Sequence, residues 1–364
     1  MKNNLLLMVI SLLITLLLGD FLLGFVAPQT KHEPRFLVWS SPSFRVDQFG
    51  AVTYLPNETV RTVAVYGDEI EYDVIYKTNN MGLIDHRDYD SSENADRRLV
   101  FVGDSFTAGE HGGKPWVPQM RDRLEVDQKI AIYNLGVSGA SIHHFAKILD
   151  SFTTRIAFDE IVVLGISDDF LRRYWVPDKQ NSEIRFCDAK LPIERCRFER
   201  RPVGFVIEYD TPVDRIVDQA RNTFSAGFWD RLTIMSHFAG LVDRTLTSHQ
   251  TRKWGTLPRW QQDLFESNME SLGYISTRFP DKKRIFIQLP QKEEVAMGEY
   301  EFDLENAIEA QGFEYISLMG DCSWSLDMFL EKDGHPNQLG YENIERCVAE
   351  ALSLRPSQSL GESL

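Results

Sequence analysis

Residues 99–109 read LVFVGDSFTAG, and this stretch decides the fold. Its first four residues, Leu99–Val102, form an apolar run without a polar face, which predicts a strand buried on both sides. The chain then turns at once through Gly103, Asp104 and Ser105. A fully buried strand that leads directly into a turn and a helix is typical of a parallel sheet with crossover helices.

Working outward from this stretch, we find four more short apolar runs, separated by segments with helical patterns. This alternation predicts an α/β domain built on a five-stranded parallel sheet that is covered by helices on both faces. In such sheets the functional residues lie beyond the carboxyl ends of the strands. The four runs are Ile130–Tyr133, Ile161–Leu164, Ile285–Gln288 and Phe313–Leu318.

The start of the chain carries a localisation signal. Residues 5–19 read LLLMVISLLITLLLG, and after Asp20 the apolar run resumes to residue 27, which gives a stretch of bilayer length. Because Pro28 follows the candidate cleavage point, an uncleaved signal anchor over 1–27 is favoured over a cleaved signal peptide. We therefore expect the rest of the chain to lie outside the cytoplasm, in the periplasm or at the cell surface.

The remainder of the chain divides into three parts. Runs rich in β-branched and aromatic residues predict a small β-rich extension over 28–96. The strand and helix alternation occupies 97–356, with an insertion at about 169–255 between the third and fourth strands. The tail, 357–364, is rich in serine, leucine and glycine, and we expect it to be disordered.

Four cysteines are too few for a disulfide scaffold, but a location outside the cytoplasm permits individual disulfides. Cys187 and Cys196 are close enough in sequence to close a loop inside the insertion. Cys322 and Cys347 either form a second disulfide or are two buried thiols.

Charge and composition exclude several classes of function. The 364 residues contain 39 Lys and Arg against 54 Asp and Glu, a net charge of −15 without a basic cluster, which argues against a nucleic-acid partner. The pair His143 and His144 lacks the helical i, i+4 spacing of a metal site. The glycine-rich residues 109–114 fail as a phosphate loop, because Ala108 and Pro115 occupy positions that the motif requires for Gly and Ser/Thr. We expect neither a metal nor a cofactor.

Ser105 lies just past the end of the first strand, where backbone N–H groups at the start of a helix can face a developing oxyanion. A serine nucleophile needs a base, and His335 is the histidine with suitable surroundings. It follows the fifth strand and precedes a helical stretch, so it belongs to the same sheet edge as Ser105. Asp333 can accept from the imidazole N–H and fix its tautomer, and Gly334 permits the tight bend between them.

Two other strand ends face the same crevice. Residues 134–141 (NLGVSGAS) follow the second strand, and their glycines, Gly136 and Gly139, let backbone amides approach a substrate closely. Residues 165–169 (GISDD) follow the third strand.

Taken in order, Gly103-Asp104-Ser105, Gly139, the segment at Gly165 and Asp333-x-His335 resemble the four sequence blocks of the SGNH hydrolases, also called GDSL-type esterases. The resemblance covers about residues 98–354. It implies a flavodoxin-like three-layer α/β/α fold and hydrolysis of carboxylic esters by a Ser-His-Asp triad.

Upstream, residues 78–83 (TNNMGL) resemble the lead-in of membrane-anchored bacterial members of this family. Carried over by position, the resemblance makes Ser105 the nucleophile, His335 the general base and then acid, and Asp333 its orienting carboxylate. The amides of Ser105 and Gly139 would be oxyanion donors.

One block departs from the family pattern. The family has an asparagine in a GxND segment, and its side-chain amide is a third oxyanion donor. Here the position falls on Ser167 or, if the end of the motif is aligned, on Asp168. A serine hydroxyl can still donate, whereas an ionised aspartate would repel the oxyanion. Asn337 or a residue of the insertion would have to compensate.

The sequence therefore predicts a membrane-anchored, extracytoplasmic serine esterase. We expect it to remove small acyl groups, such as acetyl, from a cell-envelope carbohydrate or lipid through an acyl-enzyme. One alternative is an O-acyltransferase that uses the same triad to acylate an envelope polysaccharide. A second is a binding protein that retains the fold without turnover, as the missing asparagine suggests. The partners expected are the acylated substrate and the membrane.

Overall fold

The structure is a computed structural model, and the residues that it describes are 2–26, 35–40, 44–90, 95–124, 129–178, 183–187, 206–224, 236–239, 241, 257 and 259–354. Cys196 and the tail at 357–364, for which we made predictions, lie outside the described residues.

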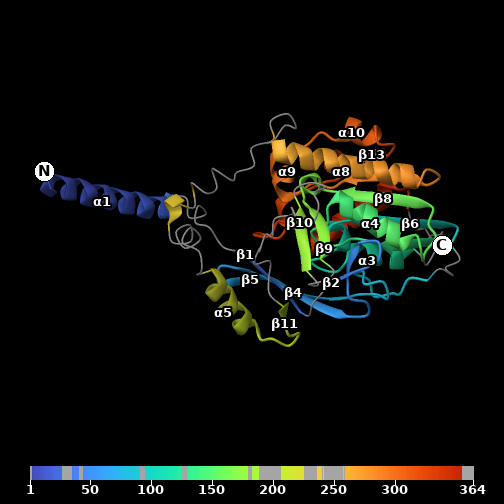
Figure 1. Cartoon of the computed structure of the whole chain (residues 1–364), viewed down its shortest axis with the longest axis horizontal. Helices are drawn as coiled ribbons and strands as arrows, with labels where there is room; N and C mark the ends of the chain where they lie inside the picture. The colour runs from blue at the N-terminus through green and yellow to red at the C-terminus, as the bar shows by residue number, and fades with distance from the viewer. Residues whose placement is uncertain are drawn as a thin grey trace, which may run out of the picture.

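A five-stranded sheet forms the centre of the molecule, and all of its strand pairs are parallel (Figure 1). Its strand order is β13-β12-β8-β6-β7. Counted along the chain this is the order 5-4-3-1-2 of flavodoxin-like folds, in which the order reverses between the first and third strands. The parallel sheet expected from the sequence is thus confirmed. The strands are β6 (Arg97–Gly103), β7 (Ile130–Asn134), β8 (Glu160–Gly165), β12 (Lys283–Gln288) and β13 (Glu314–Ser317).

Helices cover both faces of this sheet, and the side chains of β6 show why its sequence is apolar throughout. Leu99 and Phe101 pack into one core cluster, together with residues of α3 (Trp116–Leu124) and α12 (Gln338–Ala351). The alternate residues of β6 pack into the cluster on the other face, with α4 and α8. Successive side chains of a strand point to opposite faces, so both sets must be apolar. The other helices that the structure describes in this domain are α2 (Ser105–Ala108), α4 (Ile142–Phe152), η2 (Ser167–Phe170), α8 (Arg259–Arg278), α9 (Lys292–Met297), α10 (Glu305–Glu309), α11 (Leu318–Asp321) and η5 (Leu326–Met328).

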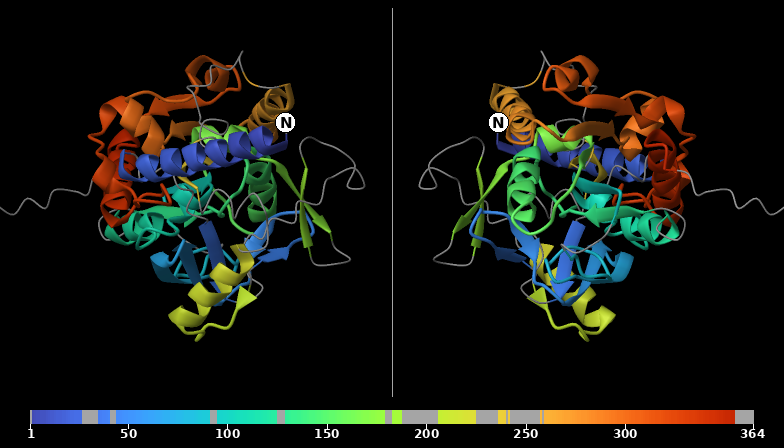
Figure 2. Two further views of the ribbon diagram at one scale, coloured as in Figure 1. Left: turned by 90° about the vertical axis from the view of Figure 1, so that its left-hand side faces the viewer. Right: turned by 90° about the vertical axis from the view of Figure 1, so that its right-hand side faces the viewer.

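A second sheet joins the β-rich segment to the insertion. Its strand order is β11-β1-β4-β5, and β11 comes from the insertion, where it pairs in parallel with β1. Helix α5 covers this sheet, because its buried Ile216 and Ala220 pack against residues of β1 and β4. Figure 2 shows the second sheet and α5 together at the bottom of both views. The elements are β1 (Arg35–Ser40), β4 (Thr59–Tyr66), β5 (Glu69–Lys77), β11 (Val206–Ile207) and α5 (Val213–Phe224).

Two hairpins complete the described strands. The first, in the β-rich segment, pairs β2 (Phe44–Val46) with β3 (Val52–Tyr54). The second, in the insertion, pairs β9 (Tyr174–Asp178) with β10 (Glu183–Cys187).

At the start of the chain, Lys2–Val26 form the helix α1, which extends away from the sheets in Figure 1. We expected an anchor that crosses the membrane at residues 1–27. Within the part of the chain that the structure describes, no helix meets the length and apolarity that crossing a membrane requires.

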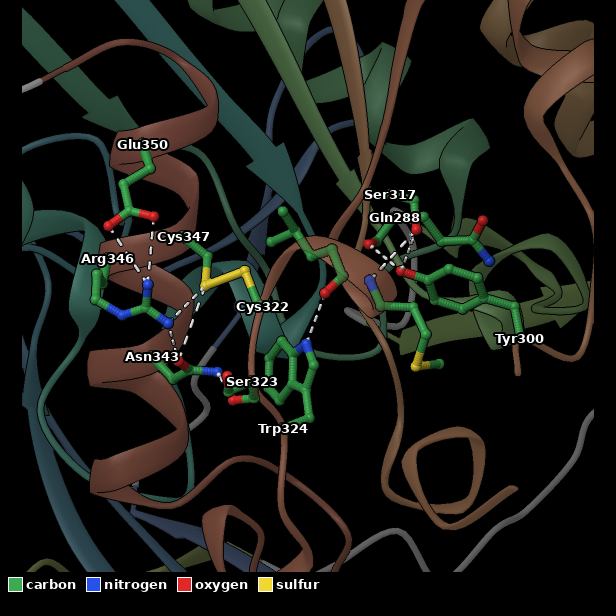
Figure 3. The surroundings of a disulfide bond; sticks show 12 residues. Gln288, Tyr300, Ser317, Cys322, Ser323, Trp324, Asn343, Arg346, Cys347 and Glu350 are labelled. Carbon is green, nitrogen blue, oxygen red and sulfur yellow. Dashed lines mark hydrogen bonds and ion pairs between the residues drawn. A yellow bond between two sulfur atoms is a disulfide. The ribbon is translucent and has the colours of Figure 1, made fainter. Parts of the chain in front are cut away.

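Cys322 and Cys347 form a disulfide, which decides between the two alternatives left open for them (Figure 3). It ties the end of α11 to α12. Cys187 is also disulfide-bonded, and its expected partner, Cys196, is not among the described residues.

Candidate active site

Ser105 is placed by a tight junction between β6 and α2. The carboxylate of Asp104 caps α2 by accepting from the backbone N–H of Phe106 at 2.8 Å. Gly103 is required at this junction, because a Cβ there would lie 2.0 Å from Thr107 Oγ1. The strand therefore delivers the Ser105 hydroxyl directly at its carboxyl end, and Ser105 is 2% exposed.

The structure brings Ser105, His335 and Asp333 together. Ser105 Oγ lies 2.8 Å from His335 Nε2, although 230 positions separate the two residues. His335 Nδ1 contacts the Oδ1 atom of Asp333, whose side chain is fully buried. A neutral imidazole that donates from Nδ1 to this carboxylate presents the lone pair of Nε2 to the serine hydroxyl. Gly334 has φ +81°, the left-handed conformation that lets Asp333 turn back onto the ring.

The loop that carries His335 is fixed from both sides. The backbone N–H of Leu330 donates to the carbonyl of His335 at 2.8 Å. Asn337 caps α12, since its Oδ1 accepts from the N–H of Gly340 and its Nδ2 donates to the carbonyl of Asp327 at 2.6 Å. Asn337 is therefore a structural cap, and its amide is already engaged there.

The two backbone amides expected to bind an oxyanion belong to the loops after β6 and β7. Among the described residues, neither Ser105 nor Gly139 has an acceptor for its backbone N–H. Gly139 has φ +71°, and a Cβ at this position would lie 3.4 Å from the ring of Trp175. The positive φ, rather than the space beside Trp175, favours glycine at this position, and no described residue accepts from either amide.

Ser167 and Asp168, the candidates for the third donor, are both engaged elsewhere. The hydroxyl of Ser167 donates to Glu294 Oε1 at 2.5 Å, and Ser167 is completely buried. Asp168 Oδ2 accepts from Nε2 of Gln291 at 3.1 Å. Within the described chain, neither of them forms a hydrogen bond with Ser105 or Gly139.

Two residues near the site had not been singled out as functional from the sequence. Tyr66, at the end of β4, donates from its hydroxyl to Asp333 Oδ2 at 3.0 Å. The ring of His111 stands edge-on to that of His335 with centroids 4.3 Å apart, and His111 is 2% exposed. His111 follows the serine loop in sequence, whereas no local signal pointed to Tyr66.

His111 also has an uncommon backbone conformation, with φ +78° at a residue other than glycine. Its backbone N–H donates to the hydroxyl of Tyr76 at 2.5 Å. The preceding residue, Glu110, is fully buried and hydrogen-bonded to the hydroxyl of Tyr54. Burial raises the pKa of Glu110 to about 8, and the nearby carboxylate of Asp104 adds to this shift. Residues of the β-rich segment thus pack against the loop that follows Ser105.

The described residues contain no group of three or more His, Cys, Asp or Glu side chains arranged to hold a metal ion.

No family model matches the chain, and no curated protein matches it. Among solved structures it is similar to a lipase/acylhydrolase from Enterococcus faecalis, at 14% identity over 72% of this chain and 100% of that one, with a TM-score of 0.35. It is also similar to the psychrotrophic esterase EstA from Pseudoalteromonas, at 10% identity over 71% and 97% of the two chains, with a TM-score of 0.37.

A third similar structure is an acetyl xylan esterase from the rumen bacterium Butyrivibrio proteoclasticus, at 9% identity over 83% of this chain and 72% of that one, with a TM-score of 0.34. Because all three TM-scores are below 0.5, the function of this chain is inferred from its own residues. The solved structures to which the chain is similar are, by their names, an acylhydrolase and two esterases.

Proposed function

We propose that the protein is a serine esterase of the SGNH type, with Ser105 as nucleophile, His335 as general base and acid, and Asp333 as the orienting carboxylate. The observation that carries the proposal is the 2.8 Å approach of Ser105 Oγ to His335 Nε2, with Asp333 on the other ring nitrogen. A hydroxyl, an imidazole and a buried carboxylate in this order are the parts that nucleophilic acyl transfer requires.

In the first half of the reaction, Ser105 Oγ attacks the carbonyl carbon of the ester while its proton passes to His335 Nε2. Asp333 stabilises the imidazolium that forms. The backbone amides of Ser105 and Gly139 bind the oxyanion. The tetrahedral intermediate collapses when His335 gives its proton to the leaving alcohol, which leaves the acyl group on Ser105.

In the second half, water attacks the acyl-enzyme and His335 accepts one of its protons. Collapse of this second intermediate returns the proton to Ser105 Oγ and releases the carboxylic acid. The active site is then restored, with no other reactant consumed.

The substrate that we propose is a small acyl ester, such as an acetyl ester, on a cell-envelope carbohydrate or lipid. The Cys322–Cys347 disulfide supports a location outside the cytoplasm, because disulfides persist in oxidising compartments. The apolar sequence at 1–27 motivates the attachment to a membrane. An alkaline phosphatase fused to the C-terminus would be active if the C-terminus lies outside the cytoplasm. Carbonate extraction of membranes would test whether the chain is attached to the membrane.

Turnover of 4-nitrophenyl acetate by the purified full chain tests the reaction. Ser105→Ala and His335→Ala are each expected to lower kcat by at least about 10³-fold, because either change disables the nucleophile. His86→Ala is the matched control, since it removes a histidine whose side chain is 56% exposed. Undiminished turnover in the Ser105 or His335 variant would remove the triad assignment.

Two further measurements separate the alternatives. A fluorophosphonate probe labels an activated serine, so an unlabelled Ser105 would favour a binding protein without turnover. Adding a saccharide acceptor to the assay distinguishes hydrolysis from acyl transfer, because a transferase would yield the acylated saccharide in place of free acetate.

A further inference from the structure

Arg172, in the insertion just after η2, lies between the two loops expected to bind an oxyanion. One of its guanidinium nitrogens, Nη1, donates to the Oδ2 atom of Asp104 at 2.8 Å and to the carbonyl oxygen of Ala140 at 3.0 Å. The same nitrogen donates to Oδ1 of Asp169 at 2.6 Å. Arg172 therefore links the loops after β6, β7 and β8 through a single atom.

The first two of these acceptors are direct neighbours of the proposed oxyanion donors. Asp104 precedes Ser105, and its Oδ2 atom lies only 3.4 Å from Ser105 Oγ. Ala140 follows Gly139, so a hydrogen bond to its carbonyl limits the rotation of the adjoining backbone. The amides of Ser105 and Gly139 must keep a fixed separation to bind one oxygen atom, and Arg172 fixes both of their loops.

Arg172 is itself held in place by α8, which covers one face of the sheet. Asn268 of α8 is completely buried and donates from Nδ2 to the carbonyls of Phe170 at 3.0 Å and Arg172 at 3.2 Å. The side chain of Arg172 is 24% exposed, and its three acceptors all hold Nη1. The guanidinium is thus preorganised before any substrate arrives.

The positive charge of Arg172 also balances the negative charge of Asp104 beside Ser105. The carboxylate of Asp104 lies beside the oxygen that attacks the substrate, and an unbalanced negative charge there would oppose the negative charge that develops on the oxyanion. Burial alone would lower the pKa of Arg172, but Asp169 and Asp104 raise it above its usual value, so the side chain remains a cation. It can therefore balance Asp104 throughout the reaction.

We propose that Arg172 is the positioning residue of the oxyanion hole and compensates for the asparagine that the third block lacks. It does so by fixing the Ser105 and Gly139 loops and by neutralising Asp104. This inference rests on the proposed esterase function.

The test is the kinetics of full-chain Arg172→Met with 4-nitrophenyl acetate. Loss of one oxyanion-hole donor costs about 10²–10³-fold in kcat in other enzymes, and we expect a fall of about 100-fold with KM changed less than about threefold. Arg172→Lys keeps the cation and should recover at least about tenfold of the lost kcat. Arg173→Met, which removes the adjacent cation, is the matched control and should keep the kcat of the unmodified chain.

A double variant separates positioning from folding. Arg172→Met leaves Asp104 and Asp169 buried without their cation, so this single variant is prone to misfold. Arg172→Met with Asp169→Asn removes one of the two carboxylates and should restore the unfolding midpoint in urea. Its kcat should nevertheless stay low, because Asp104 remains unbalanced beside Ser105.

The outcomes are distinct. Normal kcat in Arg172→Met, or complete recovery of kcat in the double variant, would overturn the inference and make Arg172 a structural partner of Asp169. If the unmodified chain neither turns over the ester nor reacts with a fluorophosphonate at Ser105, the esterase proposal itself fails. A chain that is active through Ser105 but indifferent to Arg172 contradicts the inference alone.

Discussion

Three acidic side chains, Asp104, Glu110 and Asp333, are buried in the loops that surround Ser105. Each has a different use. Asp104 caps α2, Asp333 contacts the imidazole of His335, and Glu110 is hydrogen-bonded to Tyr54. Glu110 has no part in the proposed reaction. Because burial raises its pKa, the effect of pH on stability tests whether this side chain is buried in the folded protein.

Glu110 should make stability fall as the pH rises. The unfolded chain loses the Glu110 proton near pH 4.5, whereas burial holds the folded-state pKa at about 8. Between these values the unfolded state binds fewer protons, so this group lowers the free energy of unfolding progressively from about pH 4.5 to pH 8. Glu110→Gln does not titrate and is expected to lose less stability between pH 5 and pH 8.

Urea unfolding of the unmodified chain and of Glu110→Gln, each at pH 5 and pH 8, measures the difference in stability loss. The other titrating groups contribute equally to the two proteins and therefore cancel in the comparison. Glu309→Gln, an exposed position on α10, is the control and should follow the unmodified chain. An identical pH dependence in Glu110→Gln and the unmodified chain would show that Glu110 does not titrate in this range.

At the scale of elements, a disulfide bond connects the two ends of the segment between α11 and α12. The Cys322–Cys347 disulfide spans 25 positions, and the loop that it closes contains Asp333 and His335. Figure 3 shows the bond between α12 and the chain that leads to Trp324. The loop that carries His335 is therefore confined at its two ends as well as by the Asn337 cap.

Removing this link should cost stability. For a closed loop of this size, a disulfide contributes about 2–4 kcal/mol, chiefly by restricting the unfolded chain. We expect Cys322→Ser with Cys347→Ser to lower the free energy of unfolding by about this amount, measured by urea denaturation without reductant. Equal stability of the double variant and the unmodified chain would mean that the bond does not form in solution.

At the scale of the whole molecule, the second sheet is hydrogen-bonded to the loop that carries His335. Tyr66 reaches Asp333, and the neighbouring Lys332 donates from its backbone N–H to Glu71 Oε1 at 3.0 Å and from Nζ to Glu69 Oε2 at 2.7 Å. The hairpin of β4 and β5 thus contacts two consecutive residues of the loop that carries His335. The β-rich segment is structurally part of the site.

The Tyr66 hydroxyl is expected to matter for rate. A hydrogen bond to a charged group is worth about 1.5–3 kcal/mol, and loss of ~1.4 kcal/mol in the transition state slows a reaction about tenfold. Tyr66→Phe should therefore lower kcat about tenfold and leave KM nearly unchanged. Tyr274→Phe removes a comparable tyrosine–aspartate hydrogen bond, to Asp150, and should leave kcat unchanged. Unaltered kcat in Tyr66→Phe would show that the hydrogen bond from Tyr66 to Asp333 does not contribute to the reaction rate.

The sequence by itself determined the strands of the central sheet and the edge at which the site lies. Leu99–Val102 predicted a strand buried on both faces, and parallel strands end at a common edge, so Ser105 and His335 were expected at one crevice. Gly334 likewise indicated the bend that brings Asp333 to the ring. These features depend on local pattern and strand direction, which neighbouring residues encode.

Only the tertiary structure decided which distant side chains complete the site. Tyr66 comes 267 positions before Asp333, and Arg172 comes 68 positions after Asp104. Likewise, Ser167 follows a predicted strand end, but its contact with Glu294 depends on how α9 packs. Neither a tyrosine at a strand end nor an arginine after a short helix carries a periodic signal, because their partners are set by the packing of one sheet or loop against another.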